Sequence, residues 1–117
     1  MLYRSVPQQS WASGASGAKE VTIPDVRGRI EQIEVKVSNN TGNVTATVAI
    51  ASANAGSLYS QAAIPENAAT VYRATSDATD FDAFYAAGDL TVTITPSGDP
   101  GASGLTVDVN LYGEGEI

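Results

Sequence analysis

Two stretches, residues 90–95 and 105–111, alternate apolar and polar side chains without a break. This is the period of a strand with one buried and one solvent-facing side. The residues between them are rich in Pro, Gly, Ser and Asp, which favour turns. The pattern therefore predicts a long antiparallel hairpin within Gly88–Tyr112, whose inward residues form the centre of a core: Leu90, Val92, Ile94, Leu105, Val107, Val109 and Leu111.

The same alternation runs from Ile33 to Ile50, interrupted by the turn-forming stretch Asn39–Asn43. It predicts a second hairpin, because Asn and Gly tolerate the positive φ that tight turns need. Ile30 is out of phase with the apolar residues that follow it. This change of phase predicts a β-bulge near Glu31–Gln32.

The remaining patterns are shorter. A strand over Lys19–Ile23 is expected to stop at Pro24, with a turn up to Gly28. Further strands are expected over Leu58–Ala62, at a sheet edge, and over Thr70–Ala74. Acidic residues near its start and a glycine at its end predict one short helix within Asp77–Gly88. The chain is therefore expected to be all-β: an antiparallel β-sandwich or jelly-roll-like fold with one short helix and an extended N-terminal arm.

Residues 1–18 have a different character. Apolar residues in 1–11 follow no clean period, and residues 12–18 are all Ala, Ser or Gly, which resembles a linker. We therefore expect a flexible arm over 1–18 and a single β-sandwich domain over 19–117. The sole tryptophan, Trp11, lies in the arm, where it either folds back onto its own domain or anchors the chain on a partner.

The net charge of −7 is unevenly distributed. Up to Arg73, six cations and five acids leave +1, and after Arg73 eight acids and no cation give −8. Such a chain repels phosphate, so we expect no nucleic-acid partner. The first residues lack the apolar run of a signal peptide and no run has the length of a membrane span, so we expect synthesis without classical secretion and no membrane partner.

The chain has no cysteine and no histidine. Nucleophilic catalysis therefore lacks its commonest base, and paired carboxylates such as Glu34 and Asp108 fall on outward positions of strands. Three acids, Asp77, Asp80 and Asp82, lie close together but lack the spacing of a calcium loop. We expect no enzyme, no metal site and no cofactor.

Aromatic residues give the chief alternative function. A row of exposed rings on a β-sandwich stacks on sugars, so the chain could be a carbohydrate-binding module. Loss of glycan binding on changing Tyr59 or Tyr72 would support it. The row would be drawn from the aromatic residues Tyr59, Tyr72, Phe81, Phe84, Tyr85 and Tyr112. The other reading is that the aromatic residues belong to the core or close one end of it. Phe81, Phe84 and Tyr85 fit this second reading.

The phrases TVTITPSGDPG (Thr91–Gly101) and VDVNLYG (Val107–Gly113), in a small acidic chain rich in Ala, Thr, Val and Gly, resemble the small β-sandwich virion proteins of tailed bacteriophages, closest to capsid decoration (cement) proteins. The resemblance implies a non-enzymatic protein that is made in the host cytoplasm and stabilises the outer capsid surface. Its partners would be the major capsid protein and copies of itself, with a trimer favoured. A head–tail connector or fibre-base protein is an alternative. The arm would supply the contacts: Leu2, Tyr3, Val6 and Trp11.

Overall fold

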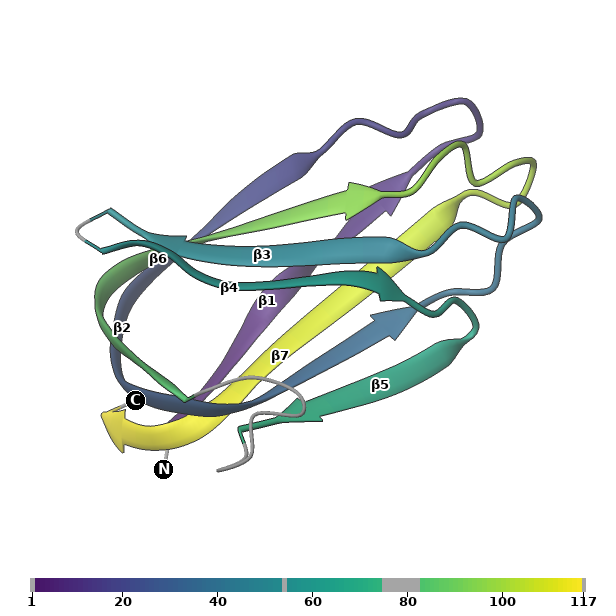
Figure 1. Cartoon of the computed structure of the whole chain (residues 1–117). Helices are drawn as coiled ribbons and strands as arrows, with labels where there is room; N and C mark the ends of the chain where they lie inside the picture. Colours follow the sequence, from purple (N-terminus) through teal and green to yellow (C-terminus); the bar gives the residue numbers. More distant parts are fainter. Residues whose placement is uncertain (1, 54, 75–82, 117) are drawn as a thin grey trace.

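The structure of the protein is a computed structural model, and it describes residues 2–53, 55–74 and 83–116. Seven strands make up the described chain: β1 Leu2–Trp11, β2 Lys19–Val37, β3 Ala46–Ser52, β4 Gly56–Ile64, β5 Ala68–Arg73, β6 Phe84–Pro96 and β7 Leu105–Glu116 (Figure 1). Every pairing between them is antiparallel. The predicted all-β, antiparallel class is therefore confirmed.

The strands form one hydrogen-bonded sheet in the order β1-β7-β2-β6-β3-β4, with β5 paired to β2. The sheet folds into two layers because β2 is long enough to pair with strands of both layers. Its first part, up to Ile30, pairs with β6, and its last part, Gln32–Val37, pairs with β5. Residues 27–37 of β2 pair with β7. Figure 1 shows the resulting two layers, with β1, β7 and β5 facing β6, β3 and β4.

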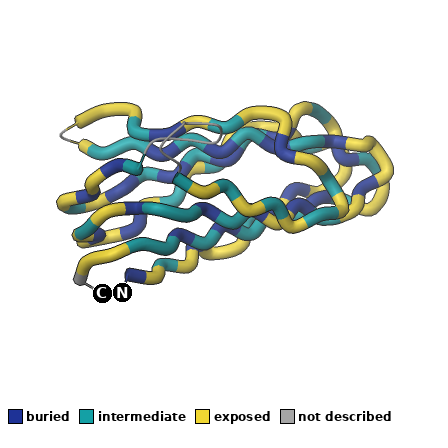
Figure 2. Tube along the Cα trace, turned by 60° about the horizontal axis from the view of Figure 1, so that its bottom comes forward, coloured by how far each residue is buried: buried dark blue, intermediate teal, exposed yellow. Residues whose placement is uncertain are grey.

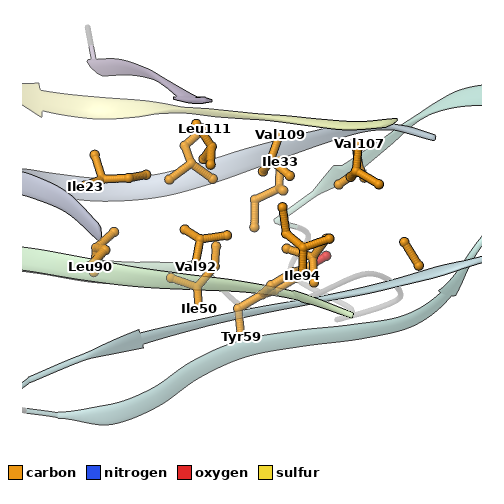
Figure 3. Close-up of a cluster of buried hydrophobic side chains, with 14 of the residues drawn as sticks. Ile23, Ile33, Ile50, Tyr59, Leu90, Val92, Ile94, Val107, Val109 and Leu111 are labelled. Carbon is orange, nitrogen blue, oxygen red and sulfur yellow. The ribbon is translucent and has the colours of Figure 1, made fainter. Parts of the chain in front are cut away.

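Buried apolar side chains fill the space between the layers. Along most strands buried residues alternate with more exposed ones, as Figure 2 shows. In Figure 3 the inward residues of β7 and β2 face those of β6 and β3, with Leu111 across from Val92 and Ile23 across from Leu90. All seven residues predicted as the centre of the core are buried, which confirms that part of the prediction: Leu90, Val92, Ile94, Leu105, Val107, Val109 and Leu111.

Both predicted hairpins are wrong in their pairing. β6 and β7 do not pair with each other, since each instead pairs with β2; β3 likewise pairs with β4 and β6 rather than with β2. The two connecting loops cross from one layer to the other, so consecutive strands pack face to face. A hydrogen bond from the Gly42 N–H to the Pro100 carbonyl, 2.8 Å long, joins these two loops.

Three further expectations need correction, and one is confirmed. The helix expected within Asp77–Gly88 is absent where the structure describes this stretch, because Phe84–Gly88 begin β6; residues 77–82 lie outside the described residues. The break at Pro24 is a bulge inside a continuous β2. Leu2–Trp11 is not a free arm but strand β1, paired with β7. The predicted bulge near Glu31–Gln32 is confirmed by a register shift between Ile30 and Gln32.

Candidate binding surfaces

The outer side of the β1, β7, β2 and β5 layer carries a row of large polar and aromatic side chains. Tyr3 lies opposite Tyr112, Tyr112 opposite Gln32, and Gln32 opposite Arg73. Because residues that are cross-strand neighbours point to the same side of a sheet, the four side chains share one face. We call these four residues the tyrosine row. Tyr3, at one end of the tyrosine row, is 44% exposed to solvent.

Side-chain contacts hold the tyrosine row in place. The rings of Tyr3 and Tyr112 lie 5.1 Å apart between centroids, tilted by 43°. The Tyr3 hydroxyl donates to Asn110 Oδ1 (3.1 Å), and Asn110 Nδ2 donates to Glu34 Oε1 (3.2 Å). At the other end, Arg73 Nε donates to Gln32 Oε1 (3.1 Å). The row is thus arranged before any ligand arrives, which lowers the ordering cost of binding.

Burial raises the pKa of the Tyr112 phenol above its ordinary value, and the nearby Glu34 carboxylate and Tyr3 add to the rise. A phenol with a raised pKa keeps its proton at neutral and mildly alkaline pH. The hydroxyl of Tyr112 is therefore a hydrogen-bond donor throughout the physiological range.

Beside Tyr112 the surface is hollowed into an open depression of about 380 Å³. It is lined by residues of β2, β5 and β7 and the residue that follows β5: Glu31, Gln32, Arg73, Ala74, Tyr112, Gly113 and Glu114. The bulge in β2 places Glu31 here, and its carbonyl accepts a hydrogen bond from the Ala74 N–H (2.8 Å). Gly113 allows the strands to approach, because a Cβ at that position would lie 1.9 Å from the Arg29 carbonyl oxygen.

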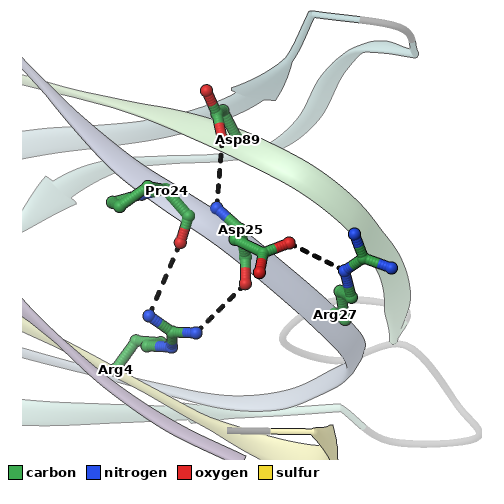
Figure 4. A network of polar contacts seen from close by, with 5 residues as sticks. All are labelled: Arg4, Pro24, Asp25, Arg27 and Asp89. Carbon is green, nitrogen blue, oxygen red and sulfur yellow. Dashed lines mark hydrogen bonds and ion pairs between the residues drawn. The ribbon is translucent and has the colours of Figure 1, made fainter.

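A second polar cluster surrounds the bulge at Pro24–Asp25 (Figure 4). Arg4 of β1 donates to the carbonyls of Pro24 (3.5 Å) and Asp25 (3.0 Å), and the Asp25 N–H donates to Asp89 Oδ1 (3.0 Å). The hydrogen bond from Arg27 to the Asp25 carboxylate, 2.7 Å long, is the main reason why the pKa of Asp25 is lowered. These bonds satisfy backbone groups that the bulge leaves unpaired. We therefore assign this cluster a structural role.

The outer side of the opposite layer is different, because it has almost no charge. No charged residue occurs between Lys36 and Glu66, a stretch that contains all of β3 and β4. Cross-strand neighbours there are small: Thr93 of β6 lies opposite Ala49 of β3, which lies opposite Ser60 of β4. We call this surface the uncharged face and define it by the following residues: Thr47, Ala49, Ala51, Ser57, Ser60, Thr91 and Thr93.

The structure separates the four residues that were predicted to bind a partner. Leu2, Val6 and Trp11 are buried at 0%, 2% and 3% exposure in the core of their own domain, which favours the alternative that this segment folds back onto the domain. The Trp11 indole N–H donates to the Gly17 carbonyl (2.7 Å), and Lys19 Nζ lies 5.1 Å from the centre of its ring. Only Tyr3 points into solvent.

The predicted sugar platform does not form at its expected position. Tyr59 is buried, and Tyr72 packs against the core. Of the aromatic residues expected in the core, Phe84 is buried and Tyr85 is 76% exposed, while Phe81 lies outside the described residues. Asp77, Asp80 and Asp82 also lie outside them. Within the part that the structure describes, no group of three or more acidic residues is arranged to hold a metal ion.

Sequence reasoning missed the roles of Gln32, Arg73 and Asn110. Each of these residues alone is an ordinary outward-facing polar side chain. Only the cross-strand register, which the sequence does not give, shows which side chains are neighbours. Among the described residues there is no helix of the length and hydrophobicity needed to span a membrane.

Comparisons with known proteins give little further information. No protein-family model and no curated protein matches the chain. A chain from a solved structure titled "Structure of infectious bursal disease virus Gx strain" aligns with a TM-score of 0.39 and 6% sequence identity. The alignment covers 99% of this chain and 33% of that one, so this chain spans about a third of the viral chain's length. A likeness at this TM-score carries no argument about function.

Proposed function

We propose that the protein is a non-enzymatic structural protein of a virus particle, a jelly-roll-like β-sandwich that decorates the outer surface of a bacteriophage capsid. The proposed partners are the major capsid protein and further copies of this chain. The resemblance of its sequence to decoration proteins suggests this role. The observation that carries the proposal is the uncharged face, in a chain whose net charge is −7.

An acidic protein gains solubility from charge, so an uncharged strip across β6, β3 and β4 needs a reason. The centres of protein–protein interfaces are depleted of charged residues, because each buried charge must be desolvated. Small side chains such as Ala49 and Ser60 also let a flat partner approach the strand backbones closely. The uncharged face is therefore suited to lie against another protein surface.

The edge of the sheet next to this face supports the same role. Among the strands that the structure describes, β4 pairs with β3 alone, and it contains no charged residue and no proline. Natural edge strands commonly carry charge or proline to prevent pairing with other chains. Contacts through such an edge would be individually weak, but repetition over a capsid lattice turns weak contacts into stable attachment.

The proposal differs from the sequence prediction in its contact surface. Leu2, Val6 and Trp11 stabilise their own domain and are not accessible to a capsid. Docking through the uncharged face needs no segment to order, so it avoids the entropy cost that a flexible arm would bring.

The test is co-sedimentation of the purified protein with capsids that lack it. Introducing a charge by Ala49→Arg or Ser60→Arg is expected to weaken attachment by about tenfold or more, because the guanidinium would be buried without a partner. Ser5→Arg, at an exposed position on the opposite layer, is the matched control and is expected to bind as the unmodified protein does. Unchanged attachment of both face variants would refute docking through this face. Failure of the unmodified protein to attach would refute the decoration role itself.

A further inference from the structure

We infer that the depression beside Tyr112 is a binding site for a neutral saccharide. The inference is independent of the proposed virion role, because it concerns the opposite layer and different residues. Of the aromatic residues considered from the sequence for a sugar platform, the site uses Tyr112. Tyr59 and Tyr72 take no part.

The volume and shape of the depression suit a small polar ligand. Its volume, about 380 Å³, lies at the lower end of the range of roughly 300–1,000 Å³ found for small-molecule sites. The walls come from three strands whose register is fixed by the bulge at Glu31 and the close approach at Gly113. Among the described residues, the geometry of the site is therefore set by the sheet.

The chemistry of the lining side chains matches sugar hydroxyls. A hydroxyl both donates and accepts, so a sugar requires donors and acceptors close together. Glu31 and Glu114 supply carboxylate acceptors, Gln32 an amide, and Arg73 a guanidinium. Hydrogen bonds to charged groups are stronger than those between neutral groups, which helps them to compete with water.

Tyr112 supplies the apolar component. The face of an aromatic ring is electron-rich and packs well against the C–H bonds on one side of a pyranose. Tyr3 contacts Tyr112 at 5.1 Å between centroids and extends the aromatic surface along the tyrosine row. The contact between the rings restrains Tyr112, which reduces the entropy lost when a ligand stacks on it.

The charges at the site argue against other ligands. Among the lining residues that the structure describes there are two carboxylates and one guanidinium, and Glu34 lies near Tyr112. This balance disfavours phosphate, sulfate and acidic sugars. Glu31 also has Arg29 as an ion-pair partner at 3.6 Å, which lowers its attraction for a cationic ligand.

The test is a nuclear magnetic resonance titration of the full ¹⁵N-labelled chain with maltotriose, cellotriose and chitotriose. Saturable shifts are expected for at least one of them at the backbone amides of residues 31, 32, 74, 113 and 114 and at the Gln32 side-chain amide. The open shape of the depression predicts weak binding, with a Kd in the high micromolar to millimolar range.

Variants separate the site from non-specific effects. Tyr112→Ala and Glu31→Ala are expected to weaken binding by about tenfold or more, while Tyr112→Phe keeps the ring and stays within a few fold. Gln8→Ala is the control, because Gln8 is exposed on the same layer and contacts Asp108 outside the depression. Glu31 is partly exposed, so its replacement tests the site even if Tyr112→Ala fails to fold.

Three results would overturn the inference. The first is an absence of shifts with all three saccharides. The second is binding that survives Glu31→Ala unchanged. The third is a stronger response of the same amides to spermidine or to sulfate than to any saccharide, which would identify an ion-binding surface instead.

Discussion

Replacing Trp11 by alanine tests whether the first residues of the chain belong to the folded domain. Trp11 is 3% exposed and ends β1, where it lies opposite Leu105 of β7. Truncating a buried tryptophan to alanine costs about 3–5 kcal/mol, through lost apolar burial and the cavity that remains. The variant also loses the hydrogen bond to the Gly17 carbonyl, a contribution of about 1 kcal/mol.

The free energy of unfolding of a domain this size is of the order of 5–15 kcal/mol, so the expected loss is a large fraction of the total. Urea denaturation followed by circular dichroism measures it without the fluorescence of the residue that was removed. With a typical slope of about 2 kcal/mol per molar urea, the midpoint should fall by roughly 2 M. Trp11→Phe keeps an aromatic ring and removes the N–H donor, so it should lose much less.

The outcome that would refute this reasoning is specific. If Trp11→Ala unfolded within about 0.5 M urea of the unmodified protein, the shift would correspond to only about 1 kcal/mol. Trp11 would then lie outside the core, and residues 1–18 would be an arm that is independent of the domain. In the unmodified protein, the same conclusion would follow from a tryptophan emission spectrum typical of full exposure to water.

Two further predictions concern single positions. Gly113→Ala should destabilise the fold by several kcal/mol, because the new Cβ would lie 1.9 Å from the Arg29 carbonyl oxygen. Gly98→Ala is the control: a Cβ there would have nothing within 4 Å, so the thermal midpoint of unfolding should stay unchanged. Equal midpoints for the two variants would contradict the β2–β7 register. Hydrogen bonds from the backbone N–H groups of Gly101 and Gly14 lower the pKa of Asp99 below its ordinary value of 3.8. The Asp99 carboxylate therefore stabilises the fold at pH values above 3.8, and this contribution is lost as the pH falls through the lowered pKa of the folded state. The amide resonances of Gly14 and Gly101 should therefore titrate with a midpoint below 3.8, and should not titrate in Asp99→Ala; a midpoint at or above 3.8 would contradict these bonds.

The alternation of apolar and polar residues was sufficient to predict the class of fold and most of the core. It identifies inward residues such as Val92 and Val109 because burial on one side of a strand leaves a period of two in the sequence. It also revealed the bulge at Glu31, because an inserted residue shifts that period by one. These features are local, so they can be read from neighbouring residues.

The pairing of strands could not be predicted in the same way. A turn such as Asn39–Asn43 allows a hairpin, but it equally allows a crossing to the other layer, and alternation is the same in both cases. Pro24 illustrates the limit at a single residue. It lacks an N–H and therefore suggested a strand end, yet the bulge places it inside β2, with Arg4 of a distant strand bonded to its carbonyl.

The candidate site was predictable only in fragments. Tyr3 was predicted to contact a partner and Tyr112 was considered for a sugar platform, but their contact with each other depends on a pairing between distant parts of the sequence. The irregular spacing of Leu2, Val6 and Trp11 hid a strand, because the register shift between Val6 and Gln9 breaks the period. The alanine, serine and glycine residues after Trp11 then suggested a linker, although they form only a short connection into β2.

The pairing of β1 with β7 has a consequence for the order of folding. Leu2 lies opposite Gly113, so β1 gains its partner only after almost the whole described chain has been synthesised. β2 waits as well, because Gln32–Val37 needs β7 on one side and β5 on the other. Folds dominated by such distant contacts form slowly, typically in milliseconds to seconds. The native pairing of β1 and of the end of β2 can therefore be completed only after β7 has been synthesised.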